Sequence, residues 1–217
     1  DAGVAGARCN LGVCYEHGEG VKQDYQKAVE LYQQAAEQGD LAAQCNLGYL
    51  YEEGFGVDQS WEQAVRWYGR AAKEHYPRAQ CSLGVCYEFG HGVEKDTVRA
   101  AELYRQAAEQ GDQVAQCNLG YLYETGVCVR QSWEEAVSWY SRSAEQSHPR
   151  AQYNLAWCYE HGKGLSKDLG KARALYQAAA DRKYEGAQEA MDQLEKKEPR
   201  QRRGGFLREL LDGFRSR

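Results

Sequence analysis

Eight cysteines are the residues best able to form disulfides or bind a metal, and seven of them recur at fixed intervals. Four are spaced by 36 residues and three by 72: Cys9, Cys45, Cys81 and Cys117, then Cys14, Cys86 and Cys158. In a helical array, copies one repeat apart lie about one helix diameter apart, roughly 10 Å. A disulfide needs Cα atoms within about 7 Å. We therefore predict reduced thiols that serve as small buried hydrophobic side chains, in a reducing, cytoplasmic compartment.

The five histidines offer little support for a metal centre. They are His17, His75, His91, His148 and His161, all near predicted helix ends and loops. The sequence contains neither His-x-x-x-His nor Cys-x-x-Cys, the spacings that usually carry zinc. It also lacks Gly-x-Ser-x-Gly and a phosphate-binding loop. We predict no metal, no cofactor and no catalytic residues, and an enzyme is the third of three functional alternatives.

Charge divides the chain into an acidic body and a basic tail. The formal net charge of the 217 residues is −5. Residues 195–217 carry eight Lys and Arg against four Asp and Glu, a net +4, so residues 1–194 carry −5 − 4 = −9. An acidic body argues against nucleic acid as a partner, because neutralising phosphates needs a basic surface. No run reaches 18 apolar residues, so the sequence predicts no membrane-spanning helix.

Internal repetition dominates the sequence. Five leucines are spaced by 36 residues without insertion: Leu11, Leu47, Leu83, Leu119 and Leu155. Around each, a phrase such as ARCNLGVCYEHGEGV (7–21) recurs, followed by a second phrase such as KAVELYQQAAEQG (27–39). Repeats one and three resemble each other, as do two and four, which indicates duplication of a 72-residue unit. A fixed period of this length is typical of solenoids.

Each phrase predicts one helix. Ala7, Leu11, Gly12 and Tyr15 form a stripe with helical periodicity, and the second phrase has a comparable stripe around Tyr32. The Gly-x-Gly-Val segment between the phrases supplies residues that tolerate positive φ at a helix end. Capping residues open each second helix: Asp24, Ser60, Asp96, Ser132 and Asp168. Helix pairs stacked at a constant period bury each other's faces.

These phrases resemble the Sel-1-like repeat, a relative of the tetratricopeptide repeat. The first repeat carries the full pattern: Ala7, Leu11, Gly12, Tyr15, Gly18, Gly20, Val21, Lys27, Ala28, Tyr32, Ala35 and Ala36. The resemblance implies an all-α fold, a right-handed α-solenoid of helix-turn-helix repeats of 36 residues. Two positions depart from the pattern. Cys128 replaces the second loop glycine of repeat four, which leaves that loop's conformation open, and Ala156 replaces the glycine of Leu-Gly in repeat five, a mild change at a packing position.

The resulting domain plan has four parts. Residues 1–6 read as the remnant of a preceding repeat or an N-terminal cap, and residues 7–186 form five repeats. Their bounds are 7–42, 43–78, 79–114, 115–150 and 151–186. Residues 187–198 start like another first helix but turn polar, which suits a capping helix. Residues 199–217 form a basic amphipathic tail.

A candidate partner-binding surface follows from the resemblance, because first helices line the concave face in such solenoids. Cys9, Val13 and Glu16 lie about 180–240° around the first helix from Ala7, outside the predicted stripe. The predicted face comprises Val13, Glu16, Tyr49, Glu52, Val85, Glu88, Tyr121, Glu124, Tyr153, Trp157 and Glu160. This is an apolar track edged by one glutamate per repeat, suited to a basic or amphipathic segment. Alternatively, the glutamates are merely solvated helix-end residues.

The tail itself has the chemistry of such a segment. If residues 205–215 are helical, one face carries Phe206, Leu207, Leu210, Leu211 and Phe214, with Arg203 upstream. A basic amphipathic helix can dock in a helix-lined groove, lie on an anionic membrane surface, or pack on the last repeat as a cap. We therefore expect a non-catalytic scaffold or adaptor that binds a protein or peptide. A membrane-surface adaptor anchored by the tail is the main alternative.

Overall fold

The structure, a computed structural model, describes residues 2–197, which form eleven α-helices and no strand. In chain order they are α1 (Ala2–His17), α2 (Tyr25–Glu37), α3 (Leu41–Glu53), α4 (Trp61–Lys73), α5 (Pro77–Phe89), α6 (Thr97–Glu109), α7 (Gln113–Thr125), α8 (Trp133–Glu145), α9 (Pro149–His161), α10 (Leu169–Asp181) and α11 (Ala187–Lys197). The predicted all-α solenoid is confirmed. The predicted amphipathic helix of the tail, with Phe206 to Phe214, lies outside the described residues.

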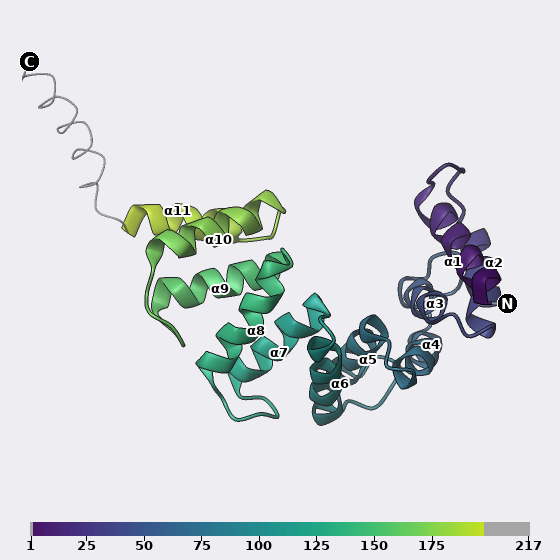
Figure 1. The fold of residues 1–217 in the computed structure, drawn as a ribbon, viewed down its shortest axis with the longest axis horizontal. Helices are drawn as coiled ribbons and strands as arrows, with labels where there is room; N and C mark the ends of the chain where they lie inside the picture. The colour runs from purple at the N-terminus through teal and green to yellow at the C-terminus, as the bar shows by residue number, and fades with distance from the viewer. Residues whose placement is uncertain (1, 198–217) are drawn as a thin grey trace, which may run out of the picture.

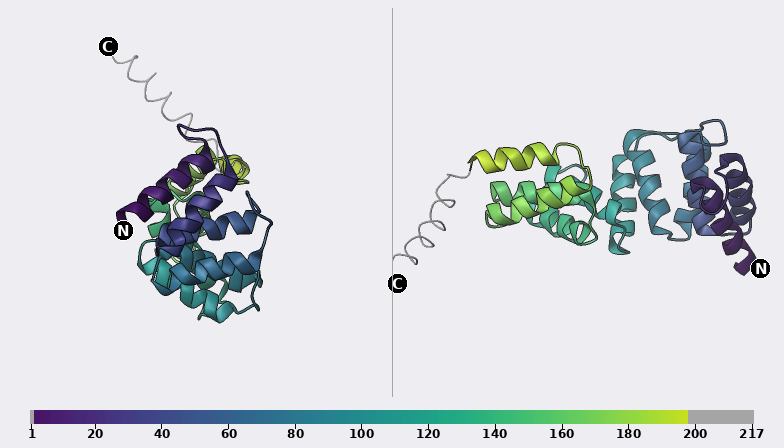
Figure 2. Two further views of the ribbon diagram at one scale, coloured as in Figure 1. Left: turned by 90° about the vertical axis from the view of Figure 1, so that its right-hand side faces the viewer. Right: turned by 90° about the horizontal axis from the view of Figure 1, so that it is seen from above.

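The helices stack as consecutive pairs. Each helix packs against the helices before and after it in the chain, and contacts between more distant elements are few. The stack curves into an open arc that runs from α1 and α2 at one end to α10 and α11 at the other (Figure 1). Seen from above, the pairs follow one another along the long axis (Figure 2). The odd-numbered helices α1 to α9 are the first helices of the five repeats, and α11 packs on α10.

The predicted caps and turns form as the residue types require. Asp96 has extended backbone dihedrals, and its Oδ1 accepts a hydrogen bond of 2.9 Å from the Arg99 amide at the start of α6. The four other predicted caps of the second helices make the same contact. Gly90 ends α5 in the left-handed region with φ 78°, where a side chain would be strained. These short turns fix the angle between the two helices of a repeat.

The second loop glycine permits close contact between neighbouring repeats. A Cβ at Gly92 would lie 2.4 Å from the backbone of Trp61 at the start of the preceding even-numbered helix. Cys128 occupies the equivalent place and keeps a positive φ of 58°, so this loop retains the left-handed conformation despite the side chain. The residue opposite is Thr97 rather than an aromatic residue, and the Cys128 Sγ donates to its Oγ1 at 3.1 Å.

One tyrosine per repeat forms the centre of each helix pair. Tyr32, Tyr68, Tyr104, Tyr140 and Tyr176 are all at most 1% exposed. The predicted leucine stripe is buried from repeat two onward, where Leu47 is 1% exposed. The stripe prediction is wrong for two residues of the first helix: Leu11 is 44% exposed, and Ala7 is exposed as well. Leucines at this position pack against the preceding second helix, and Leu11 lies on the open face of the first repeat instead.

Candidate interaction surface on the odd-numbered helices

The apolar track predicted on the first helices is only partly open to solvent. Tyr121 is its most exposed member, with 39% of its surface accessible. The others are half-buried: Val13, Tyr49, Val85 and Trp157. Val13 and Tyr49 pack at the margin of one core cluster, and Trp157 at the margin of another. The structure therefore places these side chains along the edge of the core, with one flank available to a ligand.

Aromatic stacking fixes the C-terminal end of the track. The Trp157 ring stacks on Trp133 of the previous repeat with 5.6 Å between centroids, and on His161 at 4.3 Å. Tyr153, also predicted to face a partner, lies 5.3 Å from the rings of both Tyr176 and Tyr184. Rings held on both sides lose little side-chain freedom when a ligand adds a further contact. Ring contacts therefore hold Trp157 and Tyr153 in place at this end of the predicted surface.

The five predicted glutamates make the same contact in every repeat. Each Oε2 accepts a hydrogen bond from the hydroxyl of the tyrosine sixteen residues later, on the second helix of its own repeat. The pairs and distances are Tyr32–Glu16 2.6 Å, Tyr68–Glu52 2.6 Å, Tyr104–Glu88 2.6 Å, Tyr140–Glu124 2.5 Å and Tyr176–Glu160 3.0 Å. A charged acceptor makes such a bond short and strong. These carboxylates clamp the two helices of a repeat together, a role that neither sequence-based interpretation included.

Burial and the nearby carboxylates also change the chemistry of the tyrosines. Desolvation, followed by the hydrogen bond to Glu88, raises the pKa of Tyr104 far above its ordinary value of about 10. The same two causes raise the pKa of the four equivalent tyrosines. These hydroxyls therefore remain protonated donors throughout the physiological range, and each glutamate keeps its partner.

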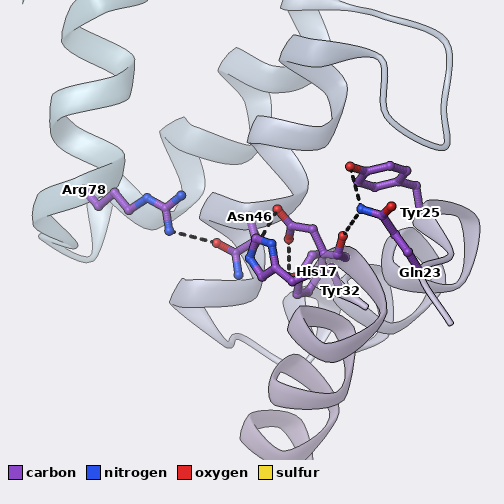
Figure 3. A network of polar contacts seen from close by, with 7 residues as sticks. His17, Gln23, Tyr25, Tyr32, Asn46 and Arg78 are labelled. Carbon is purple, nitrogen blue, oxygen red and sulfur yellow. Dashed lines mark hydrogen bonds and ion pairs between the residues drawn. The ribbon is translucent and has the colours of Figure 1, made fainter. Parts of the chain in front are cut away.

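Two arginine–asparagine pairs on the odd-numbered helices were missed by the sequence analysis. The Arg78 Nη1 on α5 donates to Asn46 Oδ1 on α3 at 3.0 Å, and 72 residues later Arg150 on α9 donates to Asn118 on α7 at 3.2 Å. Figure 3 shows the Arg78–Asn46 contact, and Asn46 is also within hydrogen-bonding reach of the Tyr32 hydroxyl. The 72-residue duplication, which carries both arginines and both asparagines, was the available signal. These pairs join consecutive first helices and bring positive charge to the track.

Arg150 connects this polar network to the track. Its guanidinium lies over the Tyr121 ring, 5.5 Å from the centroid. A cation over an aromatic face is attracted by the ring quadrupole. The result is a mixed patch on α7 and α9 in which an exposed aromatic ring, a guanidinium and an asparagine amide lie together. Such a patch can bind apolar side chains and can also donate hydrogen bonds to a peptide backbone.

The recurring cysteines do not lie outside the packing stripe, and that prediction is wrong. Cys45 is 1% exposed and Cys117 is completely buried, because this face of each first helix meets the neighbouring repeat. Their interpretation as small buried hydrophobic side chains is confirmed for six of the eight; Cys14 is half-buried and Cys128 is exposed. Desolvation raises the pKa of Cys117 to about 12, so its thiol is unreactive at neutral pH.

Within residues 2–197, no group of three or more His, Cys, Asp or Glu side chains is arranged to hold a metal ion. The helices of this part of the chain are also too short or too polar for any to cross a membrane.

Comparison with known proteins agrees with this architecture. The Sel1 repeat family model matches residues 5–40, 41–76, 77–112, 113–148 and 149–184. A search of curated proteins finds no match. Among solved structures, a Sel1 repeat protein from Oxalobacter formigenes has 34% identity and a TM-score of 0.78, covering 86% of this chain and 74% of that protein.

Two further structures have more specific descriptions. One is c5321, described as a protective antigen of uropathogenic Escherichia coli strains with an SLR fold, at 38% identity and a TM-score of 0.74. The match covers 87% of this chain but only 40% of that antigen. The other is immunity protein Pa5087 from Pseudomonas aeruginosa, with 23% identity, a TM-score of 0.60, and coverage of 84% of this chain and 67% of that one. This last likeness shows the fold alone. With five consecutive family matches over most of its length, the chain belongs to the Sel1 repeat family.

Proposed function

We propose that this chain is a non-catalytic scaffold that binds a segment of another protein along its odd-numbered helices. Sel1 repeat proteins generally act as protein-interaction scaffolds. The observation that carries the proposal is the patch around Tyr121, where a 39% exposed ring lies under the Arg150 guanidinium. The fold does not require an exposed aromatic residue at this position, since valine occupies it in repeats one and three. Tyrosine and arginine are enriched where interfaces gain most of their binding energy.

The partner segment we propose is amphipathic and basic. Its apolar side would contact Tyr121, Trp157 and the equivalent residues, because these are the groups whose remaining exposed surface can be buried. The acidic charge of residues 1–194, net −9, would attract it and speed association. The clamped glutamates contribute to this field without leaving their tyrosines. Residues 203–215 of the same or a neighbouring chain are the simplest occupant.

A crosslinking experiment tests the location of the surface. A photo-reactive amino acid at position 121 of the full-length chain should capture a partner in extract from the native cell. The same group at Arg105, exposed on the second helix α6, is the matched control and should capture it far less. The Trp157→Ala variant should reduce capture at position 121. Equal capture at both positions would contradict the proposed surface.

The rival function, a membrane-surface adaptor, rests on the +4 net charge of residues 195–217 and the apolar stripe predicted in the tail. Cosedimentation with anionic vesicles, before and after deletion of residues 199–217, separates the two. We expect the face formed by the odd-numbered helices, called the odd-helix face, to capture a protein partner even when no lipid is present. Vesicle binding that depends on the tail, together with no protein capture, would favour the rival.

A further inference from the structure

A buried glutamine recurs in the first turn of the first helices, and its amide must find partners inside the protein. Gln44, Gln80, Gln116 and Gln152 are 7%, 0%, 5% and 6% exposed. Gln44 and Gln116 each donate through Nε2 to a carbonyl near the end of the preceding helix, at 3.1 and 3.2 Å. The side-chain oxygens then need separate donors, because a buried acceptor without a partner is unfavourable.

In two repeats, a second glutamine supplies that donor. The residue that caps the C-terminus of the following second helix inserts its side chain. Gln110 Nε2 donates to Gln80 Oε1 at 2.8 Å. Gln146 Nε2 donates to Gln116 Oε1 at 2.9 Å and also to the carbonyl of Gly111 at 2.9 Å. In repeats three and four, the side-chain amide of a second glutamine therefore occupies the site beside the buried glutamine, which we call the niche.

In repeat two the donor is missing. The capping residue of α4 is Glu74, whose ionised carboxylate can only accept hydrogen bonds. Gln44 Oε1 is buried and has no hydrogen-bond partner among the described residues, and the same holds for Gln152 Oε1 in repeat five, where Arg182 caps α10. Gly39, which corresponds to Gly111 and shares its positive φ, lies at the same niche. Repeat two thus retains the acceptors of the niche but lacks the amide that fills it.

A depression opens at this point, and its other side chains are cationic. It has a volume of about 530 Å³ and is lined by Gly39, Leu41, Gln44, Arg70, Lys73 and Glu74. Arg70 lies over the Trp67 ring at 4.4 Å, and neither Arg70 nor Lys73 forms an ion pair within residues 2–197. Two cations against one carboxylate leave the lining with a formal charge of +1. The lining therefore offers uncompensated acceptors and an excess of positive charge.

We infer that this depression, the repeat-two niche, binds a primary carboxamide carried near a carboxylate, as in free glutamine or in a peptide that ends in glutamine. The amide nitrogen would donate to Gln44 Oε1 and the Gly39 carbonyl, as Gln146 does to Gln116 and Gly111. The carboxylate would lie against Arg70 and Lys73. Because Gln44 Oε1 is covered in this structure, the ligand must displace the groups that cover it. Arg70, Lys73 and Glu74 are exposed, flexible side chains in the same lining.

N-acetyl-L-glutamine is the probe, added to the ¹⁵N-labelled full-length chain while the Gln44 side-chain amide is followed by NMR. A ligand of this size should bind with a Kd on the order of 1 mM. N-acetyl-L-glutamate, which has the same shape but a carboxylate in place of the side-chain amide, should bind at least about tenfold more weakly. L-glutamine and a pentapeptide ending in glutamine then distinguish a free amino acid from a chain end as the source.

Three variants make the test decisive. Glu74→Gln should insert its own amide, raise the melting temperature and abolish probe binding. Lys73→Ala should weaken the binding of N-acetyl-L-glutamine but not that of N-acetyl-L-glutaminamide, which lacks the carboxylate. Lys163 is a cation on the loop after α9. The Lys163→Ala variant is therefore the control and should change the binding of neither probe. Any of three results would overturn the inference. The glutamine and glutamate probes could bind equally well, or the Glu74→Gln variant could bind the probe as tightly as the unaltered chain. The Gln44 amide signal could also fail to shift at a probe concentration 20-fold above the expected Kd.

Discussion

The Tyr176 hydroxyl donates to Glu160 over 3.0 Å, whereas the equivalent tyrosines of the first three repeats donate over 2.6 Å. Repeat five is also the one in which Ala156 replaces glycine. In repeats one to four, a Cβ at that glycine would come within 2.6–2.8 Å of the tyrosine ring. The longer bond in repeat five therefore accompanies a methyl group that the ring must accommodate.

The first prediction follows from this contact. Gly84→Ala should destabilise the protein by about 1–2 kcal/mol, because overpacking against Tyr104 exceeds the roughly 1 kcal/mol that alanine gains over glycine in a helix. Gly69→Ala is the matched control, since Gly69 also lies inside a helix but has open space around its Cβ position. That control should gain about 1 kcal/mol. Thermal unfolding followed by circular dichroism measures both, and stabilisation by Gly84→Ala would contradict the packing argument.

Sequence periodicity was sufficient for the fold because each local signal agreed with the others. The leucine spacing, caps such as Asp96 and the loop glycines all predicted the same helix pairs, and the structure has them. The exceptions, Leu11 and Ala7 in the first repeat, show the limit of a pattern that treats all repeats as equivalent. A position buried by the preceding repeat is exposed when it lies in the first one.

The candidate site was less predictable because its contacts join residues that are distant in sequence. Helical periodicity places Glu88 beside Val85 on one helix but does not indicate that Tyr104, on the other helix, will donate to it. The Arg78–Asn46 contact likewise crosses from one repeat to the next. Such pairs depend on how helices cross, and a single sequence carries little information about crossing geometry.

The second prediction concerns alkaline pH. The five clamp tyrosines have a pKa raised by burial and by the glutamate, so above about pH 10 the unfolded chain loses protons that the folded chain retains. Their stabilising contribution is complete below pH 10 and falls as the pH rises. Each tyrosine should lower the free energy of unfolding by about 1.4 kcal/mol per pH unit, so that five together lower it by roughly 7 kcal/mol per pH unit. We expect cooperative unfolding between about pH 11 and 12, with a jump in tyrosinate absorbance at 295 nm.

A single substitution provides the control for the alkaline transition. Tyr104→Phe should lower stability at pH 7 by about 1–3 kcal/mol, because Glu88 loses its donor. It should also reduce the slope above pH 10 by about 1.4 kcal/mol per unit, since one raised pKa is gone. Titration of all sixteen tyrosines while the chain is still folded would show that the five clamp hydroxyls are not held as described.

The third prediction concerns the thiols. Burial raises the pKa of Cys9, Cys86 and Cys158 to about 12, so these groups should not react with a disulfide reagent at pH 8 in the folded protein. Cys128 is exposed and should react first. Labelling kinetics should show one fast thiol, which Cys128→Ser removes, and the buried thiols should react only on unfolding. Intact mass measured without reductant tests the expectation that all eight are reduced.

The fourth prediction joins the odd-helix face to the tail. A synthetic peptide of residues 199–217 should bind a chain lacking those residues, once circular dichroism has confirmed that the shortened chain is folded. Apolar anchors should dominate, because an exposed ion pair contributes only about 0–1 kcal/mol. Phe206→Ala with Leu210→Ala in the peptide should therefore reduce affinity by more than about tenfold, and Arg208→Ala by less than about fivefold. In the body, Tyr121→Ala with Trp157→Ala should reduce affinity similarly, whereas Val98→Ala with Arg105→Ala on α6 should not. A peptide that binds anionic vesicles but not the body would exclude the tail as occupant of this face.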